Sequence, residues 1–277
     1  MSEATESYEV FALEYARMKR PSTDFYLKHP DPHEGPREIA YYVWVIRNEN
    51  RTVVVDLGFD ERAAKERGRI LLRHPVEALK SIGVDAAEIE TVIITHMHYD
   101  HAGTATSFPK AEFILQEREV AYCTGKAMRY PVTRGSFDVV HVKDVIDANF
   151  QSRVKFVNGD KDILPGISVH LIGGHSGGLQ VVRVMTKKGP LVLASDSAHF
   201  YDTLTEHNPF TIIVNLPEMV EGWETIFDLG APPECVIPGH DPLVSELYPK
   251  HADDQMTLVL SDPPLSTTPW QEWKSSS

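Results

Sequence analysis

Short apolar runs recur along the chain, and most of them have the length and the residue types of β-strands. In the first part of the chain, the runs at 7–17, 41–46, 52–55 and 91–95 predict strands. The polar turn at 47–51 joins two of them into a hairpin. The pattern returns in six later runs, at 112–115, 154–157, 167–171, 181–185, 191–194 and 235–237.

Helical spacing is found in fewer segments. Apolar residues at 72, 76, 79 and 82 predict a helix over 75–82, with Pro75 in its first turn and Gly83 just past its end. Segments 117–122 and 218–229 are also predicted helices, and the charged segment 60–69 predicts a solvated helix or loop. Neither an internal repeat nor a low-complexity linker divides the sequence. We therefore expect one α/β domain over residues 1–277.

Three segments show no clear periodicity. Residues 18–37 hold four prolines among aromatic residues and histidines, which predicts a long loop, either a functional lid or an ordinary connection. No strand precedes His29 or His33, so we leave both out of the site. Residues 126–150 are interpreted as core packing or as the wall of a pocket. The polar tail 251–277 is expected to pack across the body or against a second subunit, which makes a homodimer a hypothesis.

Charge and composition exclude several classes of partner. The chain has 27 Lys and Arg against 40 Asp and Glu, a net charge of −13, which repels nucleic acids and anionic membranes. No apolar run approaches the length of about 18 residues that a membrane span needs. The first ten residues lack the basic and apolar regions of a signal peptide. We therefore expect a cytoplasmic protein with no nucleic-acid or membrane partner.

The densest chemistry follows the predicted strand 91–95. There the chain reads Thr-His-Met-His-Tyr-Asp-His over residues 95–101. Imidazole and carboxylate groups suit Zn²⁺ and similar divalent ions. A tight turn can point His96 and His98 at one ion, and Asp100 and His101 at another. A histidine-rich surface loop is the alternative, but short tracts of this kind more often bind metal.

Three later segments repeat the same arrangement, in which an apolar strand ends and a candidate ligand follows. These ligands are His175, Asp196 and His240. The glycine-rich stretch 173–178 lacks the ending of a phosphate-binding loop, so we expect its glycines to allow a tight turn near a metal or substrate. Together the four segments supply enough ligands for two ions that share a bridge: His96, His98, Asp100, His101, His175, Asp196 and His240.

This order of motifs resembles the metallo-β-lactamase superfamily over roughly residues 40–245. The resemblance implies an αββα sandwich, in which two mixed β-sheets are flanked by helices and the ions lie at one edge. It also implies that Asp56, in a strand ending Asp-Leu-Gly, orients a ligand histidine. The implied ligands are His96, His98 and His175 for the first metal, Asp100, His101 and His240 for the second, and Asp196 as the bridge.

Within the superfamily, the chain resembles the N-acyl homoserine lactonases, which act in quorum quenching. The similar stretches are His-Tyr-Asp-His-Ala-Gly at 98–103, Gly-His-Ser-Gly-Gly-Leu-Gln at 174–180 and Ser-Asp-Ser-Ala-His-Phe-Tyr at 195–201. The resemblance implies a hydrolase that opens the ester ring of a lactone by attack of a hydroxide bridging two ions. Asp100 would then pass a proton to the leaving alkoxide. Zn²⁺ is the expected metal, although Mn²⁺, Fe²⁺ and Co²⁺ accept the same ligands.

His199 departs from that lactonase pattern, because known quorum-quenching lactonases have a tyrosine at this place after the bridging aspartate. The tyrosine's role cannot be carried over unchanged. We predict that His199 lines the site as a catalytic group and donates a hydrogen bond to the substrate or the developing oxyanion. Packing beside the metals as a supporting group is the alternative role.

Other functions fit the sequence less well. Glyoxalase-II-like thioesterases share all seven ligands and are the main alternative, followed by hydrolysis of another small lactone. True β-lactamases lack the bridging aspartate, and the nuclease branches use a basic surface. A non-enzymatic metal-binding scaffold would be expected to lack ligands, and none is missing here. We expect residues 18–37 and 126–150 to shape the pocket that selects the substrate.

Overall fold

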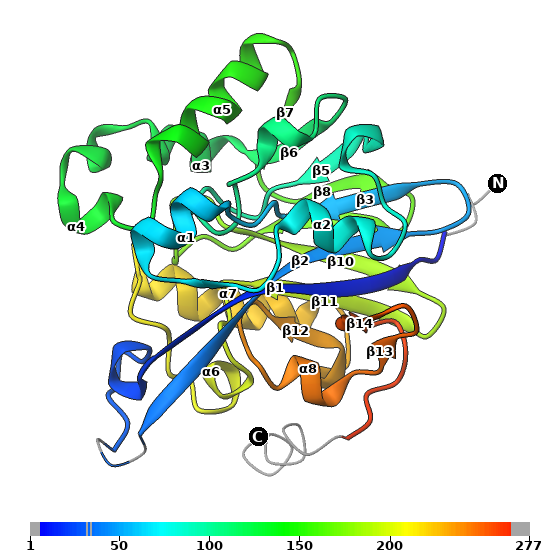
Figure 1. The fold of residues 1–277 in the computed structure, drawn as a ribbon. Coiled ribbons are helices and arrows are strands. Elements are labelled where there is room, and N and C mark those ends of the chain that lie inside the picture. Colours follow the sequence, from blue (N-terminus) through cyan, green and yellow to red (C-terminus); the bar gives the residue numbers. More distant parts are fainter. Residues whose placement is uncertain (1–5, 32, 34, 267–277) are drawn as a thin grey trace.

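The computed structural model describes residues 6–31, 33 and 35–266, and its strands form two β-sheets (Figure 1). The strands of the first sheet are β1 (Glu9–Pro21), β2 (Pro36–Arg47), β3 (Thr52–Val55), β4 (Ile70–Leu71), β5 (Thr91–Ile93), β6 (Glu112–Gln116), β7 (Val154–Val157), β13 (Lys250–His251) and β14 (Asp254–Val259). Their order is β13-β14-β1-β2-β3-β5-β6-β7, with β4 beside β1.

The second sheet is smaller and lies against one face of the first. Its strands are β8 (Lys161–Leu164), β9 (Ile167–Leu171), β10 (Gln180–Thr186), β11 (Gly189–Ser195) and β12 (Val236–Pro238). Their order is β12-β11-β10-β9-β8, and only the β11–β12 pair is parallel. The first sheet also contains both kinds of pair, since β3, β5, β6 and β7 pair in parallel and β14, β1, β2 and β3 pair antiparallel.

The alternation of side chains along β2 explains the layers. Tyr42 and Trp44 face the second sheet, where they share a buried cluster with residues such as Leu193. Tyr41 and Val43, one residue out of phase, face the helices on the other side. Residues 39–46 of β2 are buried on both faces, so this part of the strand is apolar throughout. Each fully buried large side chain contributes about 1.5–3 kcal/mol.

Helices cover the two outer faces. Their bounds are α1 (Glu61–Arg67), α2 (Pro75–Lys80), α3 (Glu117–Cys123), α4 (Pro131–Arg134), α5 (Val139–Phe150), α6 (Tyr201–Thr205), α7 (Leu216–Asp228) and α8 (Val244–Leu247). Helices α1, α2 and α5 pack on the first sheet, and α7 packs on the second through Trp223 and Ile226 (Figure 1). The order of layers is helix, sheet, sheet, helix, which confirms the predicted αββα sandwich of two mixed sheets.

The prediction of a long loop over 18–37 is wrong at both ends of the segment. Strand β1 continues to Pro21 and β2 begins at Pro36, and these two prolines face each other as the last pair of a projecting ribbon. A missing N–H is harmless at a strand end, which is why the prolines do not prevent pairing. Glu38 also forms ion pairs with Arg17 and Lys19 across the ribbon.

The predicted tail packs on the body in its first part, where it forms a strand that the sequence did not predict: β14 extends the first sheet by pairing with β1. Strand β8 has no counterpart among the predicted strands either. Segment 126–150 contains α4, α5 and a short 3₁₀ helix at Lys126–Arg129. Residues 267–277, with both tail tryptophans, lie outside the described residues, so contact with a second subunit remains a prediction. Within the described ranges, none of the helices is both long and apolar enough to cross a membrane.

Candidate metal centre

The loops after four strands meet at one edge of the sandwich. The loop after β5 carries His96, His98, Asp100 and His101, and the loops after β9, β11 and β12 carry the other three predicted ligands. All seven side chains are buried. Their ligand atoms fall into groups that could hold a metal ion: His96, His98, His175 and Asp196; Asp100, His101 and His240; and Asp196, His199 and His240. The structure thus brings together every residue predicted for the site.

Asp196 lies between the groups. Its Oδ1 is 3.1 Å from Nε2 of His101 and 2.9 Å from Nε2 of His240. Its Oδ2 is 3.2 Å from Nε2 of His175 and 3.8 Å from Nε2 of His96. One carboxylate oxygen therefore faces each group, which is the arrangement that a bridging ligand requires.

Two ring nitrogens in the first group are aimed at a common point. Nδ1 of His98 lies 3.0 Å from Nε2 of His175. Two nitrogen ligands of one tetrahedral Zn²⁺ ion stand about 3.3 Å apart, given Zn–N distances near 2.0–2.1 Å. The observed separation is close to that value, so these two rings fit one ion.

Backbone and side-chain acceptors fix the orientation of three of the rings. Nδ1 of His240 contacts the Ala40 carbonyl oxygen at 2.9 Å, and Nδ1 of His175 contacts the Ile212 carbonyl oxygen at 2.9 Å. As expected, Asp56 contacts a ligand histidine, with Oδ2 2.7 Å from Nδ1 of His101. In each ring the Nδ1–H donates outward, which leaves the Nε2 lone pair facing the centre.

Several buried polar atoms at the centre lack a hydrogen-bond partner among the described residues. They include Nε2 of His96, Nε2 of His101 and Oδ1 of Asp196. Buried acceptors without a donor are costly and rare in folded proteins. A divalent cation would satisfy all three, so the residues present fit such an ion.

The electrostatics of the centre also suit a cation. Burial lowers the pKa of His96 and His98 well below the ordinary histidine value, which favours the neutral form that binds metal. Burial acts in the same direction on His101, but the carboxylates of Asp196 and Asp56 outweigh it and raise the pKa of His101 well above that value. These carboxylates stabilise positive charge here, whether it is a proton or a metal ion.

His199 is also part of this centre. Its ring stacks on Phe210 with centroids 3.7 Å apart and an interplanar angle of 4°. Its Nε2 lies 3.1 Å from Oδ2 of Asp196, and burial lowers its pKa to about 3. The imidazole is therefore neutral near pH 7. Its predicted contact with the substrate remains a prediction.

Glu119 is a functional residue that sequence reasoning missed. It lies in the first turn of α3 and is fully buried. Its carboxylate accepts hydrogen bonds from the backbone N–H of Met97 at 2.8 Å, the Ser176 hydroxyl at 2.8 Å and the backbone N–H of Gly178 at 2.7 Å. Glu119 thus joins the two loops that present His96, His98 and His175. A glutamate at a helix start carries no sequence signal for this role.

Unusual backbone conformations and one close contact between backbone segments also shape the site. Asp56 and Ser195 both have left-handed backbone conformations, with φ of 60° and 46°, and both lie directly beside the cluster. Such strained residues are often found where a site is held in a fixed arrangement. At Gly239, an added Cβ would lie 2.7–2.9 Å from Ser195 and Asp196 atoms, so a side chain there would displace Asp196.

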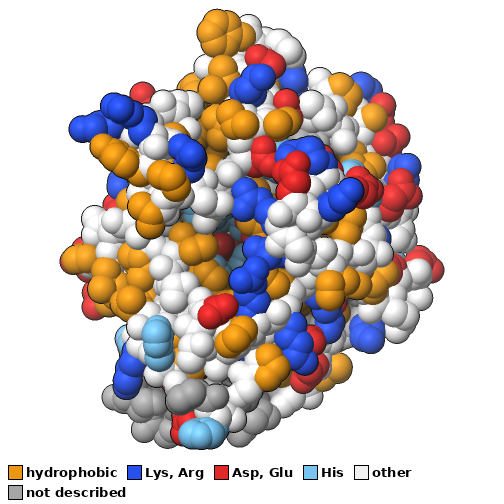
Figure 2. Space-filling view, turned by 60° about the vertical axis from the view of Figure 1, so that its left-hand side comes forward, with side chains coloured by type: hydrophobic (Ala, Val, Ile, Leu, Met, Phe, Trp, Pro, Cys, Tyr) orange, Lys and Arg blue, Asp and Glu red, His pale blue; other side chains and the backbone are white. Residues whose placement is uncertain are grey.

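A narrow pocket of about 140 Å³ opens onto the cluster. Met18 and Ile39 from the ribbon, Gly135 and Ser136 from the 126–150 segment, and Phe210 form part of its wall. Both segments expected to shape the pocket therefore contribute to it. Figure 2 shows the hollow near the middle of this face, with histidine and acidic atoms inside and Lys or Arg side chains beside it.

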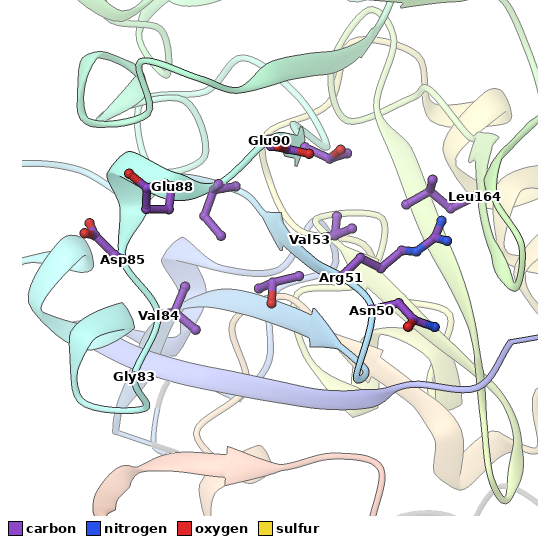
Figure 3. A pocket seen from close by; sticks show the side chains of 12 residues that line it. Asn50, Arg51, Val53, Gly83, Val84, Asp85, Glu88, Glu90 and Leu164 are labelled. Carbon is purple, nitrogen blue, oxygen red and sulfur yellow. The ribbon is translucent and has the colours of Figure 1, made fainter.

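A second, larger hollow of about 710 Å³ lies at the N-terminal ends of β3 and β5 (Figure 3). The histidine loop follows the other end of β5. Three of the four charged side chains that line the hollow already have partners. Arg51 pairs with Glu6, Glu88 pairs with Lys110, and Asp85 accepts the backbone N–H of Ala87. No metal-binding group of the described residues lies there. The smaller pocket above the histidines is therefore the candidate site.

Comparison with known families agrees with this arrangement. The family model of the metallo-β-lactamase superfamily matches residues 37–240. The chain belongs to the metallo-β-lactamase superfamily. The matched span runs from the start of β2 to His240, so it contains every ligand predicted from the sequence. The expected enzyme class, a metal-dependent hydrolase acting on ester bonds, is also confirmed. The groups of His and Asp side chains suggest divalent metal ions.

Relatives within the superfamily are similar at modest identity. An N-acyl homoserine lactonase from a Bacillus species is 24% identical over 188 residues, which is 62% of this chain and 70% of the relative. A solved quorum-quenching N-acyl homoserine lactone lactonase has a TM-score of 0.70 at 18% identity and covers 87% of this chain and 95% of its own. AidC, a dizinc quorum-quenching lactonase, has a TM-score of 0.66 at 16% identity, with 87% and 90% covered. The two structures support the fold.

Proposed function

We propose that this superfamily member opens the ester ring of a lactone at a centre of two divalent metal ions. The observation that carries the proposal is the position of Asp196, with one oxygen near His101 and His240 and the other near His175. N-acyl homoserine lactones are the first substrate class to test, because similar proteins act on them. Zn²⁺ is the expected metal.

The proposed ligands divide between two positions. His96, His98 and His175 would hold one ion, Asp100, His101 and His240 the other, and Asp196 both. When bound, such a pair of ions supplies a hydroxide nucleophile at neutral pH and a Lewis acid for the ester carbonyl. No serine or cysteine nucleophile is then required.

The side chains of the chain supply orientation and proton transfer. Asp100 lines the pocket, and its Oδ2 lies 3.8 Å from Nε2 of both His101 and His240. From there its carboxylate can hold a proton and deliver it to the alkoxide that leaves when the ring opens. The apolar wall that includes Met18, Ile39 and Phe210 excludes water and orients the rest of the substrate.

Two other substrate classes remain as alternatives. A glyoxalase-II-like thioesterase would use the same ligands, and another small lactone would use the same chemistry as an N-acyl homoserine lactone. The similarity to lactonases favours lactones over thioesters. The shape of the pocket, rather than the metal ligands, determines which of the two kinds of lactone is the better substrate.

Kinetics on purified protein test the proposal. We expect kcat/KM for at least one lactone in a panel of acyl homoserine lactones and simple lactones to exceed that for S-lactoylglutathione. A chelator should abolish activity, and elemental analysis of active protein should find two ions per chain. A higher kcat/KM for the thioester than for every lactone would favour the thioesterase. Full activity with at most one ion would contradict the dinuclear centre.

A further inference from the structure

Two arginines line the pocket above the metal centre. Arg67 is the last residue of α1, and Arg69 follows the left-handed residue Gly68, whose φ is 64°. Both line the same cavity as His98, Asp100 and Asp196. Neither arginine carries a motif that singles it out in the sequence.

Neutral groups hold both guanidinium groups in place. Arg67 donates to the carbonyl oxygens of Gly135 and Phe137, each at 2.9 Å, and its guanidinium carbon lies 3.9 Å from the centre of the Tyr99 ring. Arg69 donates from Nε to the Tyr99 hydroxyl at 2.9 Å and from Nη1 to the Arg67 carbonyl oxygen at 2.6 Å. The two side chains are thus held in place by neutral groups and not by an ion pair.

No carboxylate within the described ranges forms an ion pair with Arg67 or Arg69. Other arginines of this acidic chain do pair, such as Arg37 with Asp202, Arg62 with Asp138 and Arg73 with Asp254. Two neighbouring cations without an ion-pair partner therefore line this narrow pocket, and the Asp100 carboxylate on the same pocket acts on Arg69 only through space. The two positive charges favour an anionic ligand.

The free donors suit a carboxylate. A guanidinium group has five N–H donors in a planar fork that matches a carboxylate. Arg69 uses two of its donors in hydrogen bonds with Tyr99 and Arg67, and its Nη2 has no hydrogen-bond partner in the described part of the chain. Asp100, on the same pocket, lies near His101 and His240 and forms no ion pair with either arginine.

We propose that Arg67 and Arg69 form a subsite for a carboxylate of the substrate, so that the preferred lactone carries a negative charge outside its ring. This inference rests on the proposed lactonase function and narrows its substrate class. An N-acyl homoserine lactone with an unsubstituted alkyl chain is neutral and would leave the subsite to water. The subsite therefore favours the alternative of another small lactone, one that is acidic.

Matched substrate pairs test the subsite. One pair is N-succinyl and N-succinamoyl homoserine lactone, and the other is γ-butyrolactone bearing a carboxylate or a carboxamide beside the ring oxygen. The members of each pair have nearly the same size and shape, but one carries a negative charge and the other is neutral. For at least one pair, the carboxylate member should have a kcat/KM roughly 10–100-fold higher, mainly through a lower KM, because charge-assisted hydrogen bonds are strong. Added salt should reduce this preference.

Two variants of Arg69 and one control variant test whether Arg69 causes the preference for the carboxylate member of each pair. Arg69→Gln should remove the preference, so that the ratio of kcat/KM for the carboxylate member to kcat/KM for its carboxamide partner falls to about 1. Arg69→Lys, which keeps the charge and loses the fork, should keep part of the preference. Arg20→Gln removes an exposed charge outside the pocket and should change nothing.

Binding measurements separate this inference from the lactonase proposal. If no lactone is hydrolysed, the lactonase proposal fails. Calorimetry on the metal-loaded protein then compares the binding of ring-opened N-succinyl homoserine and N-succinamoyl homoserine. This comparison tests the carboxylate subsite without requiring hydrolysis. Tighter binding of the succinyl compound, lost in Arg69→Gln, supports it. Equal binding of both compounds, or an unchanged preference in both Arg69 variants, would overturn it.

Discussion

The two ring nitrogens of His199 cannot both donate hydrogen bonds, because a neutral imidazole carries one N–H. If the proton is on Nε2, it points at Oδ2 of Asp196, 3.1 Å away, and Nδ1 can only accept. If the proton is on Nδ1, that atom can donate to a substrate oxygen, but the Nε2 lone pair then faces a carboxylate. The second arrangement is favourable only with a cation beside Nε2. The predicted donor role of His199 therefore depends on the metal centre.

Replacing His199 tests that role. For His199→Ala we expect kcat on the best lactone to fall by about 10²–10³, the usual cost of losing an oxyanion donor, with metal content unchanged. Kinetics and elemental analysis of the same preparation measure both quantities. Phe210→Leu, which removes the stacked ring but keeps the histidine, is the control and should have a much smaller effect. Near-normal kcat would remove His199 from the mechanism, and lost metal would make it a ligand.

At the residue scale, the sequence predicts ligands better than it predicts supporting residues. His96, His98 and His101 are recognisable because one short loop after one strand carries them. Glu119 and Arg69 act through contacts that only folding creates. Glu119, for example, meets Ser176 across 57 positions of sequence. No local pattern distinguishes such a glutamate or arginine from a solvated one.

Among the elements, α3 has a role beyond packing, because its first turn holds two ligand loops at a fixed separation. The buried Glu119 carboxylate accepts three hydrogen bonds from these loops. An acceptor-only group is required, since all three partners are donors. A glutamine would present its NH₂ group to at least one donor. Burial raises the pKa of Glu119, so these donors are also needed to keep it ionised.

We expect Glu119→Gln to weaken metal binding by about 10–100-fold, as is typical when a group that orients ligands is lost. The free energy of unfolding should also fall, by about 1–3 kcal/mol, because a buried donor loses its partner. Chelator competition and denaturant titration measure the two effects. Glu117→Gln changes an exposed glutamate on the same helix and should affect neither. Wild-type metal affinity in Glu119→Gln would show that the loops hold their positions without it.

Helices and strands were predicted correctly where the apolar pattern is strong and the neighbouring element in the fold is close in sequence. The hairpin over 41–55 and the helix at Pro75 are examples. The C-terminal strand β14 was missed because its partner β1 lies at the other end of the chain, and because two of its six residues are exposed. The ribbon beyond Arg17 was missed because its prolines resemble a loop in sequence, although they occupy strand ends.

For the molecule as a whole, Asp254 joins the C-terminal strand to the rest of the first layer. It accepts hydrogen bonds from Arg73, from the Ser81 hydroxyl at the end of α2 and from Thr257. Burial would raise its pKa, but these donors outweigh burial and lower the pKa to about 2. A carboxyl with a depressed folded-state pKa stabilises the protein above its unfolded value of 3.8, and this contribution is lost as pH falls through about 2.

Asp254→Asn should therefore lower the free energy of unfolding at pH 7 by about 1–2 kcal/mol, after allowance for solvent screening. The difference from the wild type should shrink below pH 3.8 and be nearly absent at pH 2. Denaturant titrations of both proteins at several pH values, with metal removed, measure it. Asp253→Asn alters the exposed neighbour and should follow the wild type throughout. A difference independent of pH would mean that the carboxylate charge is not the cause.

The proposed ligands are divided between the two sheets, with four after β5 in the first and three after β9, β11 and β12 in the second. An ion can reach all of its ligands only while the two sheets are packed together. Metal supply would then set how long the protein survives in a cell. A free-metal concentration 100 times the dissociation constant adds about 2.7 kcal/mol to folding stability. In metal-starved cells the protein should be degraded sooner, so its abundance would follow metal availability without any change in gene expression.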